Sequence, residues 1–580
     1  MSIRKGICRY RFVTQFCIEW PRHGILNWSR IPEVPQEGRW VEVNELQTAE
    51  CYPVTVAPGQ SRLFVDFCES NPALQPFYSA LPSNSSWQRR PSVPEHWPAL
   101  IQLLAAQNTS PSAAFSLAAL AQGAGTVVTG QQVALLGGPL FTPFKAATAI
   151  ARARQATASG HPHVPIFWLA SEDHDFAEVN NVTFPTGREL RKLVYESAPD
   201  AARPAGGITF DESITPLVEQ TRDLLGADDA IAALFDGYQP GRTFAEAFAL
   251  FYSRAFAAQG LLVVDASGRE FHRLGSPVLR AAIERADELH AALLERNQAL
   301  EAAGYHAQVA VAPQSSLLFL IDDKTGARVA LKRTAPTAAE PDGLWQAGHE
   351  RYSTAELMGI LDAAPERISP SALLRPIFQD FLLSSSSIIG GPAEIAYFAQ
   401  SGVLYDRILG RQTPAASRFS ATLIEPSIAE LLRRHELPLD RIFAEDASSL
   451  ARLLAARSMP IETKRKLAAA GNALDAELNA LVDWMREQDK GLGQSADTAA
   501  SKMRYQMDRL RTLAANFQLQ RENTLTRHAE SIVQSLFPGG VLQERVHGAA
   551  YYFARYGLEL AETLCTQAAD TCPGHKAIWL

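Results

Sequence analysis

The sequence predicts an α/β fold built on a doubly wound, Rossmann-like parallel sheet, followed by an antiparallel helical coiled-coil arm. Three observations predict this fold class. Near-continuous apolar runs at 126–129, 164–170 and 261–265 suit parallel strands that are covered by helices on both faces. Helical patterns at 141–155 and 244–256 alternate with these runs, as in repeated strand–helix units. The last third of the chain shows apolar residues at helical spacing instead.

The 580 residues are too many for one hydrophobic core, so several folded parts are expected. We expect four segments, which are an N-terminal extension at 1–50, a sheet core at 51–430, a helical coiled-coil region at 431–535, and a segment at 536–580 that packs back on the core.

The core is expected to begin and end with helical segments. Residues 51–125 are mostly helical in pattern, with breaks at Pro91, Pro94 and Pro98. After the three apolar runs, a short strand is expected at 385–389, followed by a helix from Pro392 to about Leu409. Proline is common at the first position of a helix, because its missing N–H would have no partner there.

Two inserts interrupt the strand–helix alternation, at about 182–240 and 300–350. In the second insert, Tyr305–Val311 and Ser316–Asp322 are expected to form antiparallel strands joined by a turn. Arg328–Lys332 could continue this small sheet.

Two apolar stripes predict a long antiparallel hairpin of helices. The first consists of Leu467, Ala470, Leu474, Leu478, Leu481 and Met485, and the second of Met503, Met507, Leu510, Ala514 and Phe517. Gly491-Leu492-Gly493 lies between them and is expected to break the helix. The hairpin either packs against the main domain or forms the arm of a homodimer. Its Ala and Met residues suit close or adaptable packing, which favours the dimer arm.

Composition argues against several classes of function. The net charge of −8 provides no basic surface for nucleic acid. No apolar run approaches the roughly 20 residues of a membrane span, and Trp20-Pro21-Arg22-His23 interrupts any candidate signal peptide. A cytoplasmic protein without membrane or nucleic-acid partners is therefore expected.

The cysteines lie near the two ends of the chain, at Cys8, Cys17, Cys51, Cys68, Cys565 and Cys572. None lies between 69 and 564, which excludes a cysteine nucleophile in that long segment. No pair has Cys-x-x-Cys spacing, so we expect no zinc-thiolate site. A reducing compartment agrees with this pattern, and a disulfide between terminal cysteines stays open.

Acidic residues and a histidine, Glu172-Asp173-His174-Asp175, follow the strand at 164–170. The carboxyl ends of parallel strands face the ligand crevice, and buried charge is costly unless paired, so the cluster predicts a catalytic site. His174 could shuttle a proton or contact phosphate, with its charge favoured by the carboxylates, while Asp173 or Asp175 could hold an amine or Mg²⁺. The alternative is a polar turn in which Asp175 caps the next helix.

The turn Thr129-Gly130-Gln131-Gln132 follows the first strand. Gly130 permits close approach of a ligand, and the two glutamines can donate to and accept from a sugar or a nucleotide. The alternative is a solvent-exposed turn. Lys145 follows in the next helix and either contacts an anion or forms a structural pair.

Gly137-Gly138-Pro139 and Gly390-Gly391-Pro392 form a matched pair of turns. In each, two glycines precede a proline that can start a helix, and free N–H groups at a helix start attract anions. No Walker A sequence is present.

Three further residues are candidates for substrate binding. Glu394 and Tyr397 lie one helical turn apart, where Glu394 could bind an amino group and Tyr397 could stack on a sugar or base, unless it is a core aromatic. Arg375 could bind a carboxylate through its guanidinium fork, or pair with a nearby acid such as Asp380.

Together these motifs resemble the cysteine ligase family of bacillithiol biosynthesis, the cysteine-adding enzymes. The resemblance runs from about Pro58 to the C-terminus and rests on 127–145, 165–175, Gly390–Gln400 and Leu536–Arg545. It implies a ligase that joins the carboxyl group of cysteine to the amine of glucosaminyl-malate, in the last step of bacillithiol biosynthesis. It also implies inserts similar to the connective peptides of class I aminoacyl-tRNA synthetases, and a homodimer formed through the coiled coil.

Amide formation is uphill in water, so the cysteine carboxylate should first be activated, as an adenylate or an acyl phosphate. The resemblance therefore implies ATP, with or without Mg²⁺. In this interpretation His174 and the amides of the two Gly-Gly-Pro turns stabilise phosphate charge. Asp173 or Glu394 holds an amine, and Arg375 holds the malate carboxylate.

Two other functions are alternatives. The first is a nucleotidyl or acyl transferase of the same fold that acts on another amine. The second is a non-catalytic scaffold in which the coiled coil is the functional part and the sheet domain only binds a ligand. The acids at the strand end argue against the scaffold, which would not need them.

Overall fold

The computed structural model describes residues 49–82, 94–187, 189–334, 344–570 and 572–580. The described residues form two compact units: a helical one, Ser448–Arg527, and a larger one made of the described residues from Ala49 to Ala447 together with His528–Leu580. The helical unit is thus narrower than the expected region at 431–535. The expected extension at 1–50 lies outside the described residues except for its last two.

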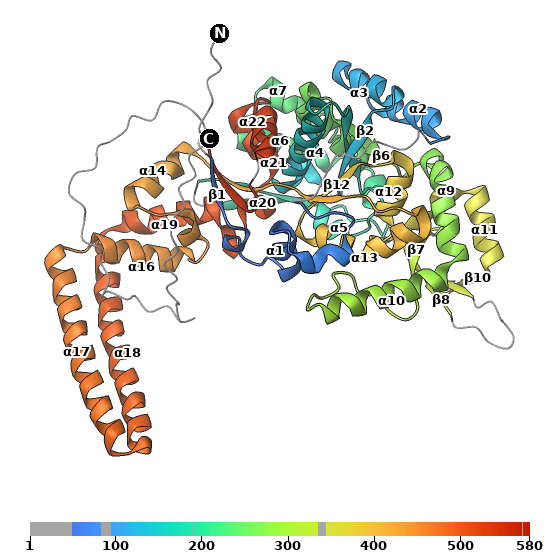
Figure 1. The fold of residues 1–580 in the computed structure, drawn as a ribbon. Coiled ribbons are helices and arrows are strands. Elements are labelled where there is room, and N and C mark those ends of the chain that lie inside the picture. Colours follow the sequence, from blue (N-terminus) through green and yellow to red (C-terminus); the bar gives the residue numbers. More distant parts are fainter. Residues whose placement is uncertain (1–48, 83–93, 188, 335–343, 571) are drawn as a thin grey trace, which may run out of the picture. The chain divides into compact units, whose positions relative to one another are not determined.

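The larger unit is built on a five-stranded parallel sheet (Figure 1). Its order is β13-β12-β2-β3-β6, and every neighbouring pair is parallel. Counted along the chain from the other edge, this is the order 3-2-1-4-5 of a Rossmann sheet, whose direction of winding reverses between β2 and β12. The strands are β2 (Gly125–Gln131), β3 (His163–Leu169), β6 (Leu262–Asp265), β12 (Ser387–Gly390) and β13 (Ala415–Ser417).

Helices cover both faces of this sheet, which confirms the doubly wound fold. In β3, Phe167 and Leu169 belong to the core on one face, and Ile166 and Trp168 belong to the core on the other. This alternation follows from the opposite directions of successive side chains in a strand. The helices of the first core include α4 (Phe141–Ala158), α8 (Phe244–Ala255), α21 (Ala549–Tyr556) and α22 (Leu560–Ala569). The helices of the second are α2 (Trp97–Gln107), α3 (Pro111–Ala121), α9 (Arg269–Glu284), α10 (Ala286–Ala302), α11 (Thr354–Ala363), α12 (Arg375–Leu383) and α13 (Pro392–Leu409).

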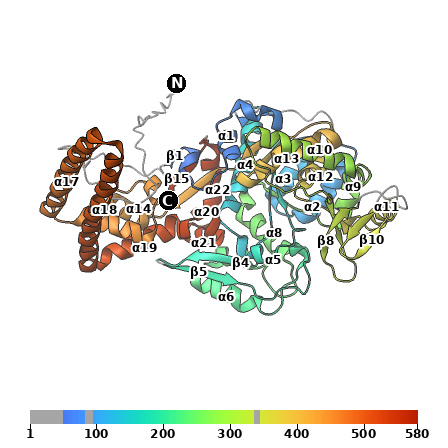
Figure 2. The ribbon, with the colours of Figure 1, turned by 90° about the horizontal axis from the view of Figure 1, so that it is seen from below.

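Two inserts carry antiparallel strands. The first contains the hairpin of β4 (Asn181–Pro185) and β5 (Leu190–Val194), which lies beside α6 (Ile214–Leu225) in Figure 2. The second forms a sheet, here called the insert sheet, with the order β10-β9-β8-β7-β11. Its strands are β7 (Ser315–Ile321), β8 (Arg328–Arg333), β9 (Trp345–Ala347), β10 (Glu350–Tyr352) and β11 (Ile368–Pro370).

The predicted strand at Tyr305–Val311 is wrong, because this segment takes no strand conformation. The backbone N–H of Val309 donates to Oε1 of Gln400, and Nε2 of Gln400 donates to the carbonyl of Val309, both at 2.9 Å. A buried side chain of α13 therefore satisfies the backbone that a neighbouring strand would otherwise pair.

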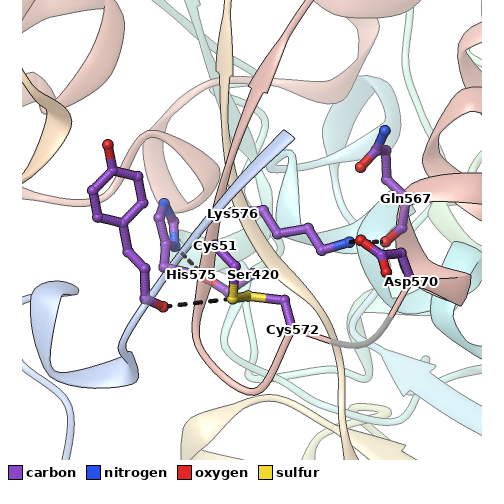
Figure 3. The surroundings of a disulfide bond; sticks show 8 residues. Cys51, Ser420, Gln567, Asp570, Cys572, His575 and Lys576 are labelled. Atoms are coloured by element: carbon purple, nitrogen blue, oxygen red, sulfur yellow. Dashed lines mark hydrogen bonds and ion pairs between the residues drawn. A yellow bond between two sulfur atoms is a disulfide. The ribbon is translucent and has the colours of Figure 1, made fainter. Parts of the chain in front are cut away.

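The C-terminal segment returns to the start of the described chain. Strand β15 (His575–Trp579) pairs in parallel with β14 (Ser420–Ile424) and antiparallel with β1 (Ala49–Tyr52). A disulfide joins Cys51 to Cys572, next to the pair of Ser420 and His575 (Figure 3). Of the remaining cysteines in the described part of the chain, Cys68 and Cys565 are free and buried.

The helical unit contains the predicted hairpin, made of α17 (Ile461–Gln488) and α18 (Lys490–Arg521). The predicted break at Gly491-Leu492-Gly493 is wrong by a few residues, because these residues belong to α18. The break is Asp489, whose backbone is extended and whose carboxylate accepts the N–H of Leu492 as a helix cap.

The residues of the predicted seam of α18 are not all buried. Met507 is buried, whereas Met503, Leu510 and Phe517 are 52%, 56% and 61% exposed. The two helices meet through two small cores. One contains Leu474, Leu478, Val482, Ala496 and Ala500, and the other includes Leu467, Ala514 and Ala515. An outer apolar stripe thus stays open on α18.

The other helices of eight residues or more along this part of the chain are α14 (Pro426–His435), α16 (Ala447–Ser458) and α19 (Asn523–Leu536). Within the described ranges, no helix combines the length and apolarity needed to cross a membrane.

Candidate active site

A pocket of about 390 Å³ lies at the carboxyl ends of β2 and β12. Gly130 and Gln131, at the end of β2, line one side of it, and Ile388 and Ile389 of β12 line another. These two strands flank the point where the winding of the sheet reverses. Ligands of open α/β sheets bind in the crevice at this point.

The pocket brings together most of the predicted binding residues. Those that line it are Gly130, Gln131, Gln132, Lys145, Asp173, Arg375, Gly391, Glu394 and Tyr397. Sequence reasoning missed other polar or aromatic residues of the lining, which are Phe141, Trp168, Glu178, Gln379, Phe398, Arg418 and Arg545. The sequence segments that meet here span more than 400 positions, from Gly130 to Arg545.

Lys145 forms a structural pair, the second of its two alternatives. Its Nζ lies 2.7 Å from the carbonyl oxygen of Gly130, 2.8 Å from Oε1 of Gln131 and 2.5 Å from Oε2 of Glu394. An ammonium group has three donors, so these three acceptors satisfy it completely. Burial lowers the pKa of Lys145, and the carboxylate of Glu394 opposes this shift.

Glu394 likewise binds groups of the protein itself. Its Oε2 also accepts the backbone N–H of Gly391 at 2.8 Å, at the first turn of α13. Tyr397 follows one turn later and lines the pocket, and burial raises its pKa well above the usual range. The N-terminus of α13, at Pro392 and Ala393, faces the same pocket.

Asp173 and Arg375 form a loose pair across the pocket. Nη2 of Arg375 lies 4.0 Å from Oδ2 of Asp173, and both side chains are partly exposed. Burial would raise the pKa of Asp173, but Arg375, the side chain of Gln132 and Arg328 together lower it. Asp173 is therefore a carboxylate at neutral pH.

Arg375 has an unused donor. Its Nε is buried and has no hydrogen-bond partner among the described residues. The alternative pairing with Asp380 is wrong, because Asp380 lies 2.7 Å from Nη2 of Arg411. A buried N–H without a partner is costly, so an anionic ligand would relieve this cost.

His174 is held by an arginine rather than by carboxylates. Nη1 of Arg328 lies 3.2 Å from Nδ1 of His174, whereas Oδ1 of Asp173 lies 3.8 Å from the same nitrogen. Because a guanidinium only donates, Nδ1 of His174 is the acceptor in this contact. His174 is not among the lining residues of the pocket.

Glu172, the first acid of the cluster, is part of the core. Its Oε1 lies 3.2 Å from Nε2 of His272, and both side chains are buried. Burial would raise the pKa of Glu172, but His272, Arg328 and Arg375 lower it. Glu172 is thus a buried carboxylate at the end of β3 that pairs with His272 and attracts Arg328 and Arg375.

Asp175 takes its alternative role. Its Oδ1 accepts the backbone N–H of Glu178 and caps the short helix α5 (Phe176–Val179). Its side chain is exposed and lies outside the pocket lining. Thr129 is also structural, because its buried hydroxyl donates to the carbonyl of Ile389 and joins β2 to β12.

The two Gly-Gly-Pro turns differ. In the first, the N–H of Gly137 donates to Tyr238 Oη and that of Gly138 to the carbonyl of Leu135, so neither amide is available for an anion. Gly138 and Pro139 do not line the pocket. In the second, Gly391 lines the pocket, but its N–H donates to Oε2 of Glu394, so this amide is not available for an anion either. Gly390 lies behind it, where an added Cβ would come within 2.8 Å of the ring of Phe398.

The C-terminal segment completes the pocket with Arg545 and anchors Arg418. Nη2 and Nη1 of Arg418 lie 2.6 Å and 3.0 Å from the two carboxylate oxygens of Glu544, a buried bidentate pair. Arg545, on the short helix α20 (Gln543–Val546), is exposed into the pocket. The motif Leu536–Arg545 contains Glu544 and Arg545 but indicates no role for them, and no motif of the sequence points to Arg418.

The described residues contain no group of three or more His, Cys, Asp or Glu side chains placed to hold a metal ion. The roles predicted for ATP and Mg²⁺ stay predictions.

Comparison with known proteins shows which family this chain resembles over most of its length. Residues 47–415 match the model described as "Bacillithiol biosynthesis BshC, N-terminal Rossmann-like domain", and residues 421–579 match "Bacillithiol biosynthesis BshC, C-terminal coiled-coil domain". The chain is 41% identical over 538 residues to the "Putative cysteine ligase BshC" of Koribacter versatilis, covering 91% of this chain and 99% of that protein. It is 34% identical over 535 residues to the protein of the same name from Solibacter usitatus, again covering 91% and 99%.

Proposed function

Because the chain belongs to the BshC family of bacillithiol biosynthesis, we propose that it is a cysteine ligase that joins the carboxyl group of cysteine to the amine of glucosaminyl-malate. The observation that carries this proposal is the pocket at the reversal point of the Rossmann sheet, with Asp173 and Arg375 facing each other across it. The substrates bring amines and carboxylates, and this pair offers one partner for each.

We assign the amine to Asp173 rather than to Glu394. Both acids line the pocket, but Oε2 of Glu394 already accepts from Lys145 and from Gly391. Asp173 is ionised and paired only loosely, at 4.0 Å from Arg375. An incoming ammonium group can therefore displace part of this weak pairing at little cost.

We assign the malate carboxylate to Arg375. Its guanidinium combines a partly exposed fork with a buried Nε that has no partner in the described part of the chain. Charge-assisted hydrogen bonds from arginine to a carboxylate are among the stronger ones in proteins, and the fork fixes the orientation of the ligand.

ATP is the proposed co-substrate, and it supplies the energy to activate the cysteine carboxyl group. The lining offers a polyphosphate the cationic side chain of Arg545 and the first turn of α13 at Ala393, which face the same space. Phe141 and Tyr397 offer aromatic surfaces near them. We propose that the reaction takes place in the cytoplasm.

We also propose that the protein is a homodimer formed through the hairpin of α17 and α18. The outer stripe of α18, defined here as Met503, Leu510, Leu513 and Phe517, follows the alternating steps of three and four residues that coiled coils use. Each of these side chains is more than half exposed. A second copy of the hairpin would bury them.

The test is turnover by the purified protein with cysteine, glucosaminyl-malate and ATP. Mass spectrometry should detect the amide product only when all three are present, together with ADP or AMP. Replacing cysteine by serine controls for unspecific acyl transfer. Hydrolysis of ATP without amide product, or amide product from another amine at equal rate, would contradict the proposal.

A further inference from the structure

Arg328 connects the insert sheet to the acidic strand end of the main sheet. It is the first residue of β8 and is 5% exposed. Its Nε donates to Oγ of Ser369 and its Nη2 to the carbonyl of Pro370, both at 2.9 Å on β11. The guanidinium also lies 3.7 Å from the ring centre of Phe319, on β7. Three strands of the insert sheet therefore fix the position of this one cation.

The remaining N–H edge of the guanidinium, at Nη1, contacts His174. Nη1 lies 3.2 Å from Nδ1 of His174. Arginine can only donate, so Nδ1 must accept and carries no proton. The nearest carboxylate oxygen, Oδ1 of Asp173, lies 3.8 Å from Nδ1 and already accepts the backbone N–H of His174 at 2.8 Å. It is thus too far from Nδ1 to receive a hydrogen bond from it.

We propose that Arg328 is a positioning residue that holds His174 as the neutral tautomer with its proton on Nε2. The proposal deepens the ligase function and rests on it for the use of His174, which does not itself line the pocket but directly follows Asp173, a lining residue. The charged groups around the two side chains are Asp173, Glu172 and Arg375. None of them replaces Arg328 at Nδ1, because in the described part of the chain no other group lies within hydrogen-bond distance of this nitrogen.

Arg328 keeps its positive charge at neutral pH. Burial and the neighbouring Arg375 lower its pKa to about 10, while Glu172 and Asp173 oppose the shift. It is therefore cationic at neutral pH. Protonation of His174 on Nδ1 would place two donors face to face at this contact.

The tautomer decides what His174 can do chemically. With Nδ1 engaged, Nε2–H is the only donor that the ring has left. His174 can then stabilise negative charge on an oxygen by donating a hydrogen bond to it, and it has no free lone pair with which to act as a base. This differs from the charged histidine that the neighbouring carboxylates suggested in the sequence.

Nitrogen NMR on protein labelled with ¹⁵N in the histidine rings tests the tautomer without any turnover. The signals of His174 are identified by their loss in His174→Gln. In the wild-type protein Nδ1 should resonate as an unprotonated ring nitrogen and Nε2 as a protonated one. In Arg328→Met the two should move toward the averaged values of mixed tautomers, and Arg328→Lys should restore much of the wild-type pattern. Arg333→Met, which removes an arginine from the other end of β8, is the matched control and should change nothing.

Turnover provides the second readout. Arg328→Met should lower kcat by about tenfold or more with little change in KM, the cost typical of losing a group that orients a reactive histidine. A protonated Nδ1 in the wild-type protein would overturn the proposal, and so would an unchanged tautomer in Arg328→Met. Failure of the ligase reaction itself would appear as absent turnover in the wild type, and it would leave the NMR result unaffected.

Discussion

Nζ of Lys145 lies 2.5 Å from Oε2 of Glu394, and this contact joins α4 to the first turn of α13 across the ends of β2 and β12. The same ammonium group holds the carbonyl of Gly130 and the side chain of Gln131. One buried cation thus sets the shape of the pocket on both sides of the point where the sheet reverses.

Lys145→Met should lower the free energy of unfolding, because Lys145 is buried and all its donors are bound within the protein. Breaking a buried pair by removing one partner typically costs about 3–5 kcal/mol, because the other charge stays buried and unpaired. Urea unfolding of Lys145→Met, Glu394→Gln and the double variant measures this. The double variant should lose less than the sum of the two single losses. Additive losses would show that the two groups are not coupled.

Arg375→Met should weaken the binding of glucosaminyl-malate. A hydrogen bond to a charged group contributes about 1.5–3 kcal/mol, so KM for this substrate should rise by about 10- to 150-fold. KM for ATP should change little. Arg375→Lys keeps the charge and loses the Nε donor, so it should recover only part of the affinity. Equal KM values in wild type and Arg375→Met would remove Arg375 from the malate site.

The outer stripe of α18 should carry the dimer. Leu510→Asp combined with Phe517→Asp places charges on exposed positions of the stripe, and light scattering should then report half the wild-type mass. Ser501→Asp combined with Thr512→Asp is the control, because both residues are exposed and lie about half a turn around the helix from Leu510. A dimer that survives the first pair of substitutions would place the interface elsewhere.

Mild acid should destabilise the larger unit through His547 and His575. Burial lowers the pKa of each to about 4, from the usual 6.5. The unfolded chain therefore binds more protons than the folded one between these values, so stability is lost as pH falls from about 6.5 toward 4. At pH 5.5 the loss is about 1.4 kcal/mol for each histidine. Urea unfolding at pH 7.5 and 5.5 measures it. In His547→Gln and His575→Gln the difference between the two pH values should shrink, and an unchanged difference would assign the effect to other groups.

The main sheet and one side of the pocket could be predicted from the sequence, because local patterns encode them. Apolar runs that end in Gly130 or in Asp173 mark strand ends, and strand ends of a parallel sheet meet at one edge. Arg328, Arg418 and Arg545 could not be predicted in this way. They reach the site from the insert sheet, from the turn after β13 and from the C-terminal segment, and no local spacing connects these segments.

Periodicity alone also could not predict that Gly491 lies inside a helix, that Leu510 is exposed, or that Val309 is not in a strand. A helix continues through glycine when packing supports it, and Asp489 offered a better cap. An apolar stripe does not tell which partner covers it, so Leu510 is exposed where a single seam was expected. The extended pattern around Val309 indicates a strand, but the side chain of Gln400, and not a neighbouring strand, binds the backbone N–H and carbonyl of Val309.

The central claim is that ligation takes place in the pocket beside Asp173. The most direct test compares the rate of amide formation by wild type, Asp173→Asn and Asp175→Asn, measured by mass spectrometry of the product. The two aspartates are two residues apart, but Asp173 lines the pocket and Asp175 caps α5 outside it. Asparagine caps a helix as well as aspartate does, so Asp175→Asn should retain nearly full activity. Asp173→Asn should lose about 100-fold or more, because the amine loses its charged partner. Wild-type rates from Asp173→Asn, or equal losses in both variants, would contradict the assignment of the reaction to this pocket.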